Sequence, residues 1–310
     1  MELVKETYSG TIREVEIGTG DKAVKVGGSE VYPLHWFEGN MGNKPRIAWE
    51  MWDKGADEMW PEAVKEPFKD VIGDPAAWAK KLQDEFGAEI ISLRLHSTDP
   101  NGMDTPVDEA VETVKKVAEA IDVPLIVCGV WNHAKDQEVL RKVADEFDGK
   151  NIAICPVEEG TYKSVGAGIL ASGNVAVAST PIDVNLAKQL NTLLTNLGVK
   201  PEKILMDPTT GGLGYGLEYS FSVMERDRMA ALVQQDEKMQ QPLICFLSFE
   251  TWKAKESREE DEKMGPPKER GIAIEAVTAT ALLSTGADVL VMRHPEAIAK
   301  VQELINEFYG

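Results

Sequence analysis

The stretch PLIVCGVW, residues 124–131, is the longest apolar run in the chain. It carries no polar residue at alternate positions, which is the pattern of a parallel strand buried on both faces. Similar short runs recur between residue 45 and the C-terminus, separated by segments with helical periodicity. They predict eight strands, at residues 46–52, 89–96, 124–130, 152–157, 175–180, 204–207, 243–248 and 289–292.

The segments between these strands carry helix start and stop signals. Pro75 and Pro106 stand where a helix would begin, and Gly87, Gly149 and Gly198 stand where one would end. The alternation predicts an α/β protein with a (β/α)8 TIM barrel over residues 45–310, a span that matches the ~250 residues typical of this fold. A doubly wound open sheet is the competing architecture.

Two regions lie outside this alternation. Residues 1–44 are predicted to form an N-terminal β-hairpin and a lead-in segment, with strands at 12–17 and 23–26 around a turn at 18–21. We expect the hairpin to plug the N-terminal end of the barrel. Residues 253–270, KAKESREEDEKMGPPKER, form an insertion in which twelve of eighteen residues are charged, so we expect an exposed excursion or a docking element, partly helical.

Composition excludes several classes of partner. Lys and Arg number 33 against 52 Asp and Glu, and the resulting net charge of −19 repels nucleic acid and anionic membranes. No apolar run is long enough to span a bilayer, and the first residues, MELVKETYSG, lack the apolar core of a signal peptide. The three cysteines, Cys128, Cys155 and Cys245, lie inside apolar runs, which predicts reduced core thiols in a cytoplasmic protein. They are too few for the four thiolates that an iron–sulfur cluster needs.

In a barrel, chemistry gathers at the C-terminal ends of the strands. Three of the four histidines, His96, His133 and His294, fall at this end. They suit acid–base or metal chemistry, although polar residues also follow buried strands simply because strands end in solvent. No predicted strand contains a lysine for a Schiff base, and neither a His-x-His pair on the first strand nor an H-E-x-x-H motif occurs. We therefore assign no catalytic or metal-binding residue.

The stretch MDPTTGGLGYGLEYS, residues 206–220, is the most informative part of this end. A predicted strand ends at Asp207, and four glycines follow before a helix begins near Glu218. Glycines allow the backbone to approach a ligand closely, but they also form tight turns that bind nothing. The spacing differs from that of a dinucleotide-binding fingerprint.

Three segments together resemble a known family. They are YPLHWFEGNMGNKPRIAWEMWD (32–53), LHSTDPNG (95–102) and DPTTGGLGYGLEYS (207–220), and the likeness extends over the whole chain. They are similar to the small subunit of the corrinoid iron–sulfur protein, whose archaeal counterpart is the delta subunit of acetyl-CoA decarbonylase/synthase. The resemblance implies a (β/α)8 subunit in a heterodimer with a large subunit that carries the four-iron cluster and a corrinoid domain, the corrinoid being shared at the interface.

The resemblance also implies a function. The complex would take a methyl group from methyltetrahydrofolate through a separate methyltransferase and deliver it to acetyl-CoA synthase, in the reductive acetyl-CoA (Wood–Ljungdahl) pathway. The D-x-H-x-x-G motif that supplies a cobalt ligand in many corrinoid proteins is absent from this chain. We expect the barrel mouth to be rich in Asn, Thr, Ser and Gly and poor in cationic groups, which suits the amide edge of a corrin.

Strand ends and the matched segments together predict the corrinoid-contacting residues. They are Thr98, Asn101, Asn132, His133, Thr180, Asp207, Thr209, Thr210, Gly211, Gly212, Gly214 and Tyr215. Four tryptophans crowd around the first predicted strand, more than one core layer would hold, so some of them are expected to contact the large subunit: Trp36, Trp49, Trp52 and Trp60.

Two other functions remain open at this point. A stand-alone pterin-binding methyltransferase shares the barrel architecture, and Asn132 and Asp207 would hydrogen-bond the pterin ring. A metal-assisted lyase would use His96, Asp99 and Asp207.

Overall fold

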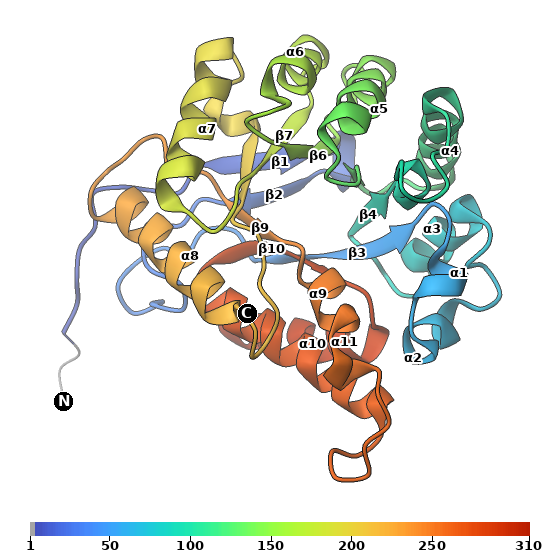
Figure 1. Cartoon of the computed structure of the whole chain (residues 1–310). Coiled ribbons are helices and arrows are strands. Elements are labelled where there is room, and N and C mark those ends of the chain that lie inside the picture. The colour runs from blue at the N-terminus through green and yellow to red at the C-terminus, as the bar shows by residue number, and fades with distance from the viewer. Residues whose placement is uncertain (1–3) are drawn as a thin grey trace.

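Eight parallel strands close into a barrel in the computed structural model, which describes residues 4–310 (Figure 1). Neighbouring strands follow the chain, and β10 pairs with both β9 and β3 to complete the ring. The predicted TIM barrel is confirmed. The strands are β3 (Arg46–Trp52), β4 (Ile90–Arg94), β5 (Leu125–Cys128), β6 (Ala153–Val157), β7 (Val175–Ser179), β8 (Ile204–Asp207), β9 (Leu243–Cys245) and β10 (Ala287–Met292).

Helices connect the strands and cover the outside of the barrel (Figure 1). Asp74 begins α3 by accepting hydrogen bonds from the Ala76 and Ala77 N–H groups, both at 3.1 Å, as an N-cap should. The helices are α1 (Ala56–Met59), α2 (Glu62–Lys65), α3 (Pro75–Asp84), α4 (Val107–Ala120), α5 (His133–Glu146), α6 (Tyr162–Ser172), α7 (Val184–Leu197), α8 (Leu217–Leu232), α9 (Leu247–Lys253), α10 (Pro267–Ser284) and α11 (Pro295–Tyr309).

Several predicted strands are shorter in the structure than in the sequence pattern, and two of these differences shape the mouth of the barrel. The strand predicted to reach residue 248 ends at Cys245, and α9 begins two residues later at Leu247. The strand predicted to reach residue 96 ends at Arg94, and His96–Thr98 forms a short 3₁₀ turn. Continuous apolar runs do not distinguish a buried strand from a buried helix turn. As a result, Phe249 lies on a helix at the mouth.

The N-terminal hairpin plugs the N-terminal end of the barrel, as predicted. β1 (Glu14–Ile17) and β2 (Val24–Gly27) pair antiparallel, and a short 3₁₀ turn lies between them. The inward side chains, Val15, Ile17, Val24 and Val26, belong to the same buried cluster as the side chains inside the barrel. Asn151, just before β6, donates hydrogen bonds to the Glu16 and Gly18 carbonyls at 2.8 and 2.9 Å. Burial of each Val or Ile side chain contributes about 1.5–3 kcal/mol, so the hairpin is part of the core.

Three of the four crowded tryptophans are core residues, so one of them remains a candidate for the expected contact with a partner. Trp49, Trp52 and Trp60 are buried in the layer between β3 and helices α1–α3. Trp60 packs edge-to-face on both Trp52 and Trp78. Only Trp36 of the four predicted residues is exposed, at 62%.

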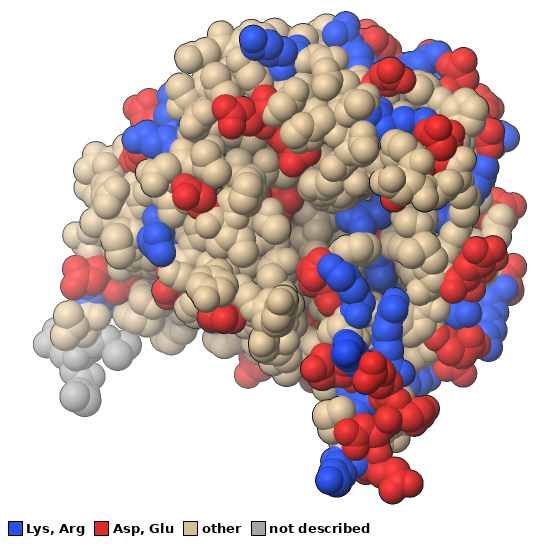
Figure 2. Space-filling model, in the orientation of Figure 1, with Lys and Arg blue, Asp and Glu red and all other residues tan. Residues whose placement is uncertain are grey.

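The charged insertion follows α9 and projects at the lower edge of the view in Figure 1. It contains a 3₁₀ turn (Lys255–Ser257) and the start of α10, so it is partly helical as expected. Arg258 anchors its base, because its Nε donates to the Trp252 carbonyl at 2.7 Å. Figure 2 shows both signs of charge interspersed over this segment. Among residues 4–310, none of the helices has the length and apolar composition needed to cross a membrane.

Candidate functional site

A cavity of about 450 Å³ opens at the C-terminal ends of the barrel strands. Its walls combine aromatic side chains with a few polar groups, which is typical of binding sites for small molecules. The lining residues come from the loops after β3, β4, β5, β8 and β9: Met59, Arg94, His96, Asp99, Val130, Trp131, Asp207, Thr209, Thr210, Phe246, Phe249 and Glu250. We call this space the mouth cavity.

Arg94, the last residue of β4, is the cationic group of the mouth cavity. Its guanidinium carbon lies over two aromatic rings, 4.6 Å from the ring centroid of Trp131 and 4.6 Å from that of Phe249. The residue is only 8% exposed, and its nearest carboxylate contact is Glu50 Oε1, 3.8 Å from Nε. Within residues 4–310, no group accepts a hydrogen bond from the Arg94 side chain. Its N–H donors are therefore available to a ligand.

Glu50, on β3, is the anionic centre beneath the cavity. It accepts two hydrogen bonds from Arg293, at 3.0 Å each, one from Trp52 Nε1 at 2.9 Å, and one from the Ser248 hydroxyl. Burial alone would raise its pKa, but the charges of Arg293 and Arg94 hold the pKa of Glu50 at about 2. Two arginines thus share one carboxylate. Arg94 is the one Lys or Arg among the residues that line the mouth cavity, so few cationic groups face it, as expected, but the expected Asn, Thr, Ser and Gly residues contribute Thr209 and Thr210 alone.

The turn after β5 presents Trp131 to Arg94 in an unusual backbone conformation. Trp131 has φ of +58°, in the left-handed region that bulky side chains rarely adopt. Asp136 holds this turn, because its carboxylate accepts the Val130 and Asn132 N–H groups at 3.0 Å each. Gly129 is required beside it, since a Cβ there would lie 2.2 Å from the Asp136 carboxylate. Burial raises the pKa of Asp136 to about 6.

Asp207 forms the opposite side of the mouth cavity, at the end of β8. Burial raises its pKa to about 6. The carboxylate accepts the Thr209 N–H at 3.0 Å, and Thr209 has φ of +62°. The Thr209 hydroxyl donates to the Thr180 carbonyl at 2.7 Å, which ties the loops after β7 and β8 together.

The three histidines at this end do not share a site. His96 stacks on Trp52 with ring centroids 4.1 Å apart, and burial lowers its pKa, so it is neutral near pH 7. His294 is buried and caps α11, where Nδ1 accepts the Glu296 N–H. The Nε2 atom of His133 lies 3.2 Å from Oε2 of Glu158. Within residues 4–310, no three His, Cys, Asp or Glu side chains are grouped closely enough to hold a metal ion.

A second cavity, of about 400 Å³, lies beside the mouth cavity over β6 and β7. His133, Glu158 and Thr180 line it. Burial raises the pKa of Glu158, which the neighbouring His133 partly offsets. Predicted contact residues therefore fall into two groups, with Asp207, Thr209 and Thr210 in the mouth cavity and His133 and Thr180 here.

The glycine loop closes on itself rather than lying open. A Cβ on Gly211 would meet the Gly216 carbonyl carbon at 2.4 Å, and Gly214 and Gly216 have positive φ. Ser220 secures the loop by accepting the Gly211 N–H at 2.8 Å and donating to the Thr209 carbonyl at 2.9 Å. Gly212 differs from these glycines, because its φ is ordinary and a Cβ there would meet open space.

Comparison with known proteins agrees with this architecture. The family described as CO dehydrogenase/acetyl-CoA synthase delta subunit matches residues 14–306. The chain belongs to this family. The delta subunit of the acetyl-CoA decarbonylase/synthase complex of Methanopyrus kandleri is 38% identical, over 95% of this chain and 74% of that protein. The corresponding subunit of Archaeoglobus fulgidus is 34% identical, over 100% of this chain and 71% of that protein.

Solved structures with a similar fold come from another family. A dihydropteroate synthase from Coxiella burnetii in complex with pteroic acid has a TM-score of 0.60 and 12% identity, covering 96% of this chain and 98% of that chain. Dihydropteroate synthase from Xanthomonas albilineans, with 4-aminobenzoic acid, has a TM-score of 0.59 and 14% identity, covering 96% and 97%. At these identities the likeness establishes the barrel fold alone.

For this member of the delta-subunit family, the structure separates the remaining predicted residues from both cavities. Thr98 is completely buried and its hydroxyl donates to the Leu95 carbonyl, which leaves no side-chain atom for a ligand. Asn132 begins α5, and its side-chain oxygen accepts the Lys135 N–H. Asn101 and Tyr215 are exposed on the rim, Tyr215 at 92%.

Arg94, Trp131 and Phe249 line the mouth cavity but were absent from the predicted set. The sequence contains a signal for Arg94, because a charged residue stands inside an otherwise apolar strand. It contains none for the two rings that contact it, since Trp131 lies in the turn after β5 and Phe249 lies on α9.

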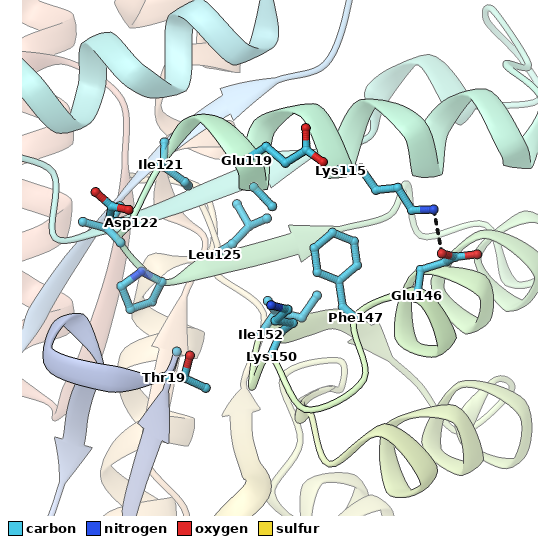
Figure 3. A pocket seen from close by; sticks show the side chains of 14 residues that line it. Thr19, Lys115, Glu119, Ile121, Asp122, Leu125, Glu146, Phe147, Lys150 and Ile152 are labelled. Carbon is cyan, nitrogen blue, oxygen red and sulfur yellow. Dashed lines mark ion pairs between the residues drawn. The ribbon is translucent and has the colours of Figure 1, made fainter.

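A further cavity, of about 340 Å³, lies at the opposite end of the barrel (Figure 3). It is lined by α4, α5 and the hairpin turn, and a Lys115–Glu146 ion pair of 2.6 Å crosses its edge. Ile121 and Ile152 in its wall precede strands β5 and β6. Barrel enzymes and binding proteins use the other end, so we place the functional site at the mouth cavity.

Proposed function

We propose that this chain is the small subunit of a corrinoid iron–sulfur methyl carrier, and that its mouth cavity covers the corrinoid held by a large partner subunit. Membership in the delta-subunit family supports this proposal, and the relatives are named as subunits of the acetyl-CoA decarbonylase/synthase complex. The observation that carries it is a mouth cavity with aromatic walls, a guanidinium whose side chain donates no hydrogen bond within residues 4–310, and a neighbouring cavity.

The residues at the mouth fit the edge of a corrin. A cavity of about 450 Å³ is smaller than a corrin ring with its side chains, so the ring would lie across the mouth while a side chain or axial group enters. Arg94 supplies donors for amide oxygens, and the exposed Thr209 hydroxyl oxygen and Asp207 supply acceptors for an amide N–H.

This chain would orient and shield the bound corrinoid. When bound, the corrinoid supplies methyl transfer, from methyltetrahydrofolate through a separate methyltransferase to acetyl-CoA synthase, in the reductive acetyl-CoA (Wood–Ljungdahl) pathway. Trp131, Phe246 and Phe249 form an apolar wall that excludes water from the covered face. Many weak polar contacts at the rim allow the cover to open for donor and acceptor.

The partner assignments follow from the same proposal. The large subunit would carry the four-iron cluster and the corrinoid domain. The three cysteines of this chain are buried and unpaired, as reduced thiols of a cytoplasmic protein would be.

Co-expression with the corrinoid-bearing subunit encoded in the same genome tests the proposal. We expect the purified pair to show the visible spectrum of a corrinoid and a one-to-one subunit ratio, and the chain alone to be colourless and without methyltransferase activity. A chain that transfers the methyl group of methyltetrahydrofolate to free cobalamin by itself would contradict the proposal and favour the pterin-binding alternative. That alternative has lost one of its two predicted ligands, because the Asn132 side-chain oxygen caps α5.

A further inference from the structure

We propose that Arg94 binds the amide carbonyl oxygens of the corrinoid edge, an inference that rests on the proposed function. It identifies one residue as the centre of recognition at the mouth and states what that residue binds. The distances, burial and charges around the guanidinium carry the proposal.

The guanidinium is fixed in place before any ligand arrives. Trp131 and Phe249 each lie 4.6 Å from its carbon, and aromatic rings stack favourably on a guanidinium. Contacts with ring faces do not use N–H donors, and Arg94 lines the mouth cavity, so its donors remain available there. A planar fork of donors suits carbonyl oxygens held at the rim of a flat ligand.

The neighbouring charges explain why the donors are unused. Among residues 4–310, Glu50 is the carboxylate that forms an ion pair with Arg94, 3.8 Å from Nε, and it already accepts two hydrogen bonds from Arg293. Arg94 is therefore set up for an acceptor that comes from outside the chain.

The charge of the cavity selects a neutral acceptor over an anion. Asp99, Asp207 and Glu250 line the same space, against Arg94 as the one Lys or Arg of the lining. The whole chain carries a net charge of −19, which also disfavours phosphates and carboxylates. A carbonyl oxygen accepts hydrogen bonds from Arg94 without adding negative charge beside these residues.

The strained turn at Trp131 supports a binding role for this arrangement. A bulky residue at φ of +58° persists only when its surroundings enforce it, and Asp136 does so through two hydrogen bonds at 3.0 Å. The strained conformation places the ring over Arg94. Asp136 is thus a positioning residue that acts through Trp131.

Corrinoid binding by the heterodimer tests the proposal. Dicyanocobinamide, whose edge carries amides, and dicyanocobyrinic acid, whose edge carries carboxylates, are titrated against the full chain paired with its large subunit, and Kd is read from visible absorbance and tryptophan quenching. We expect Arg94→Met to weaken cobinamide binding about tenfold and Arg94→Lys, which keeps the charge but loses the planar fork, to weaken it less. Lys253→Met is the matched control, because Lys253 lies over the same Phe249 ring at 5.4 Å on the exposed rim.

The outcomes separate this inference from the proposed function. Arg94→Met leaves Glu50 paired with Arg293, so we expect the variant to fold, and circular dichroism checks this. Wild-type affinity in Arg94→Met would overturn the inference while the proposed function stands. Tighter binding of the acid than of cobinamide would overturn the choice of a neutral acceptor. Failure of the wild-type pair to bind either corrinoid would overturn the proposed function itself.

Discussion

Arg293 donates two parallel hydrogen bonds to Glu50, from Nε and Nη2, at 3.0 Å each. The pair joins the end of β10 to β3, the two strands that close the barrel. Both residues are about 3–4% exposed, so the pair is buried beneath the mouth cavity. The ion pair that links the first and last strands of the barrel therefore also forms the floor beneath the mouth cavity.

Removal of the Glu50 charge should destabilise the fold. We expect Glu50→Gln to lower the free energy of unfolding by about 3–5 kcal/mol at pH 7, because Arg293 is left without its counter-charge. Glu50 has a pKa of about 2 when folded against 4.5 as a free side chain, so its contribution is complete above pH 4.5 and is lost as pH falls through 2. Urea unfolding of both proteins at pH 7 and pH 3 measures this. An equal difference at the two pH values would contradict it.

Asp227, buried in α8, should have the opposite pH dependence. Burial raises its pKa from 3.8 to about 7, and within residues 4–310 its Oδ1 has no hydrogen-bond partner. The folded state holds the proton more tightly, so stability falls as pH rises from 3.8 to about 7. We expect Asp227→Asn to be more stable than wild type at pH 8, by on the order of 3 kcal/mol, and equal to it near pH 4. Thermal unfolding at both pH values tests this, and a less stable variant at pH 8 would refute it.

The glycine loop offers a matched pair of substitutions. Gly211→Val should disrupt the loop, because a Cβ there meets the Gly216 carbonyl carbon at 2.4 Å. Gly212→Val should fold normally, since a Cβ there has no neighbour within 4 Å. If the loop frames the corrin face, Gly212→Val will lower cobalt retention by the heterodimer. Full retention with an unchanged circular dichroism spectrum would mean that the loop is only a turn.

We expect the surface around α8 to contact the large partner subunit. Figure 2 shows few charged side chains over this part of the molecule. Tyr215 is 92% exposed, Tyr219 65% and Leu213 43%, all beside the mouth. We expect Tyr215→Ser to weaken association with the large subunit about tenfold without changing the melting temperature of the chain. Trp36→Ala, on a separate exposed site, is the comparison, and equal loss in both would place the partner across both surfaces.

The barrel could be predicted from the sequence because its strands are buried on both faces. Runs such as 124–131 have no polar alternation, and each is followed by a helix with its own start signal. The boundary at Cys245 could not be predicted, because the apolar residues after it belong equally well to a strand or to the first turn of α9.

The residues of the mouth cavity could be predicted only in part. Asp207, Thr209 and Thr210 come directly after a strand, so their position at the mouth follows from the fold. The contacts of Arg94 with two aromatic rings depend on segments far apart in the chain, the turn after β5 and helix α9. The first two residues of α9 were predicted to belong to a strand. The Thr98 hydroxyl was misjudged because a short 3₁₀ turn, invisible in the pattern, buries it.

The plugged barrel also dictates an order of assembly. Val15 and Ile17 leave the ribosome before every strand of the barrel, yet they belong to the same buried cluster as Val289 and Val291 of the last strand. Their apolar face therefore stays uncovered until nearly the entire chain has been synthesised. Contacts between such distant segments form slowly, and an exposed apolar strand pair attracts other chains meanwhile. We therefore expect the hairpin to be the segment of this protein that nascent-chain chaperones bind most.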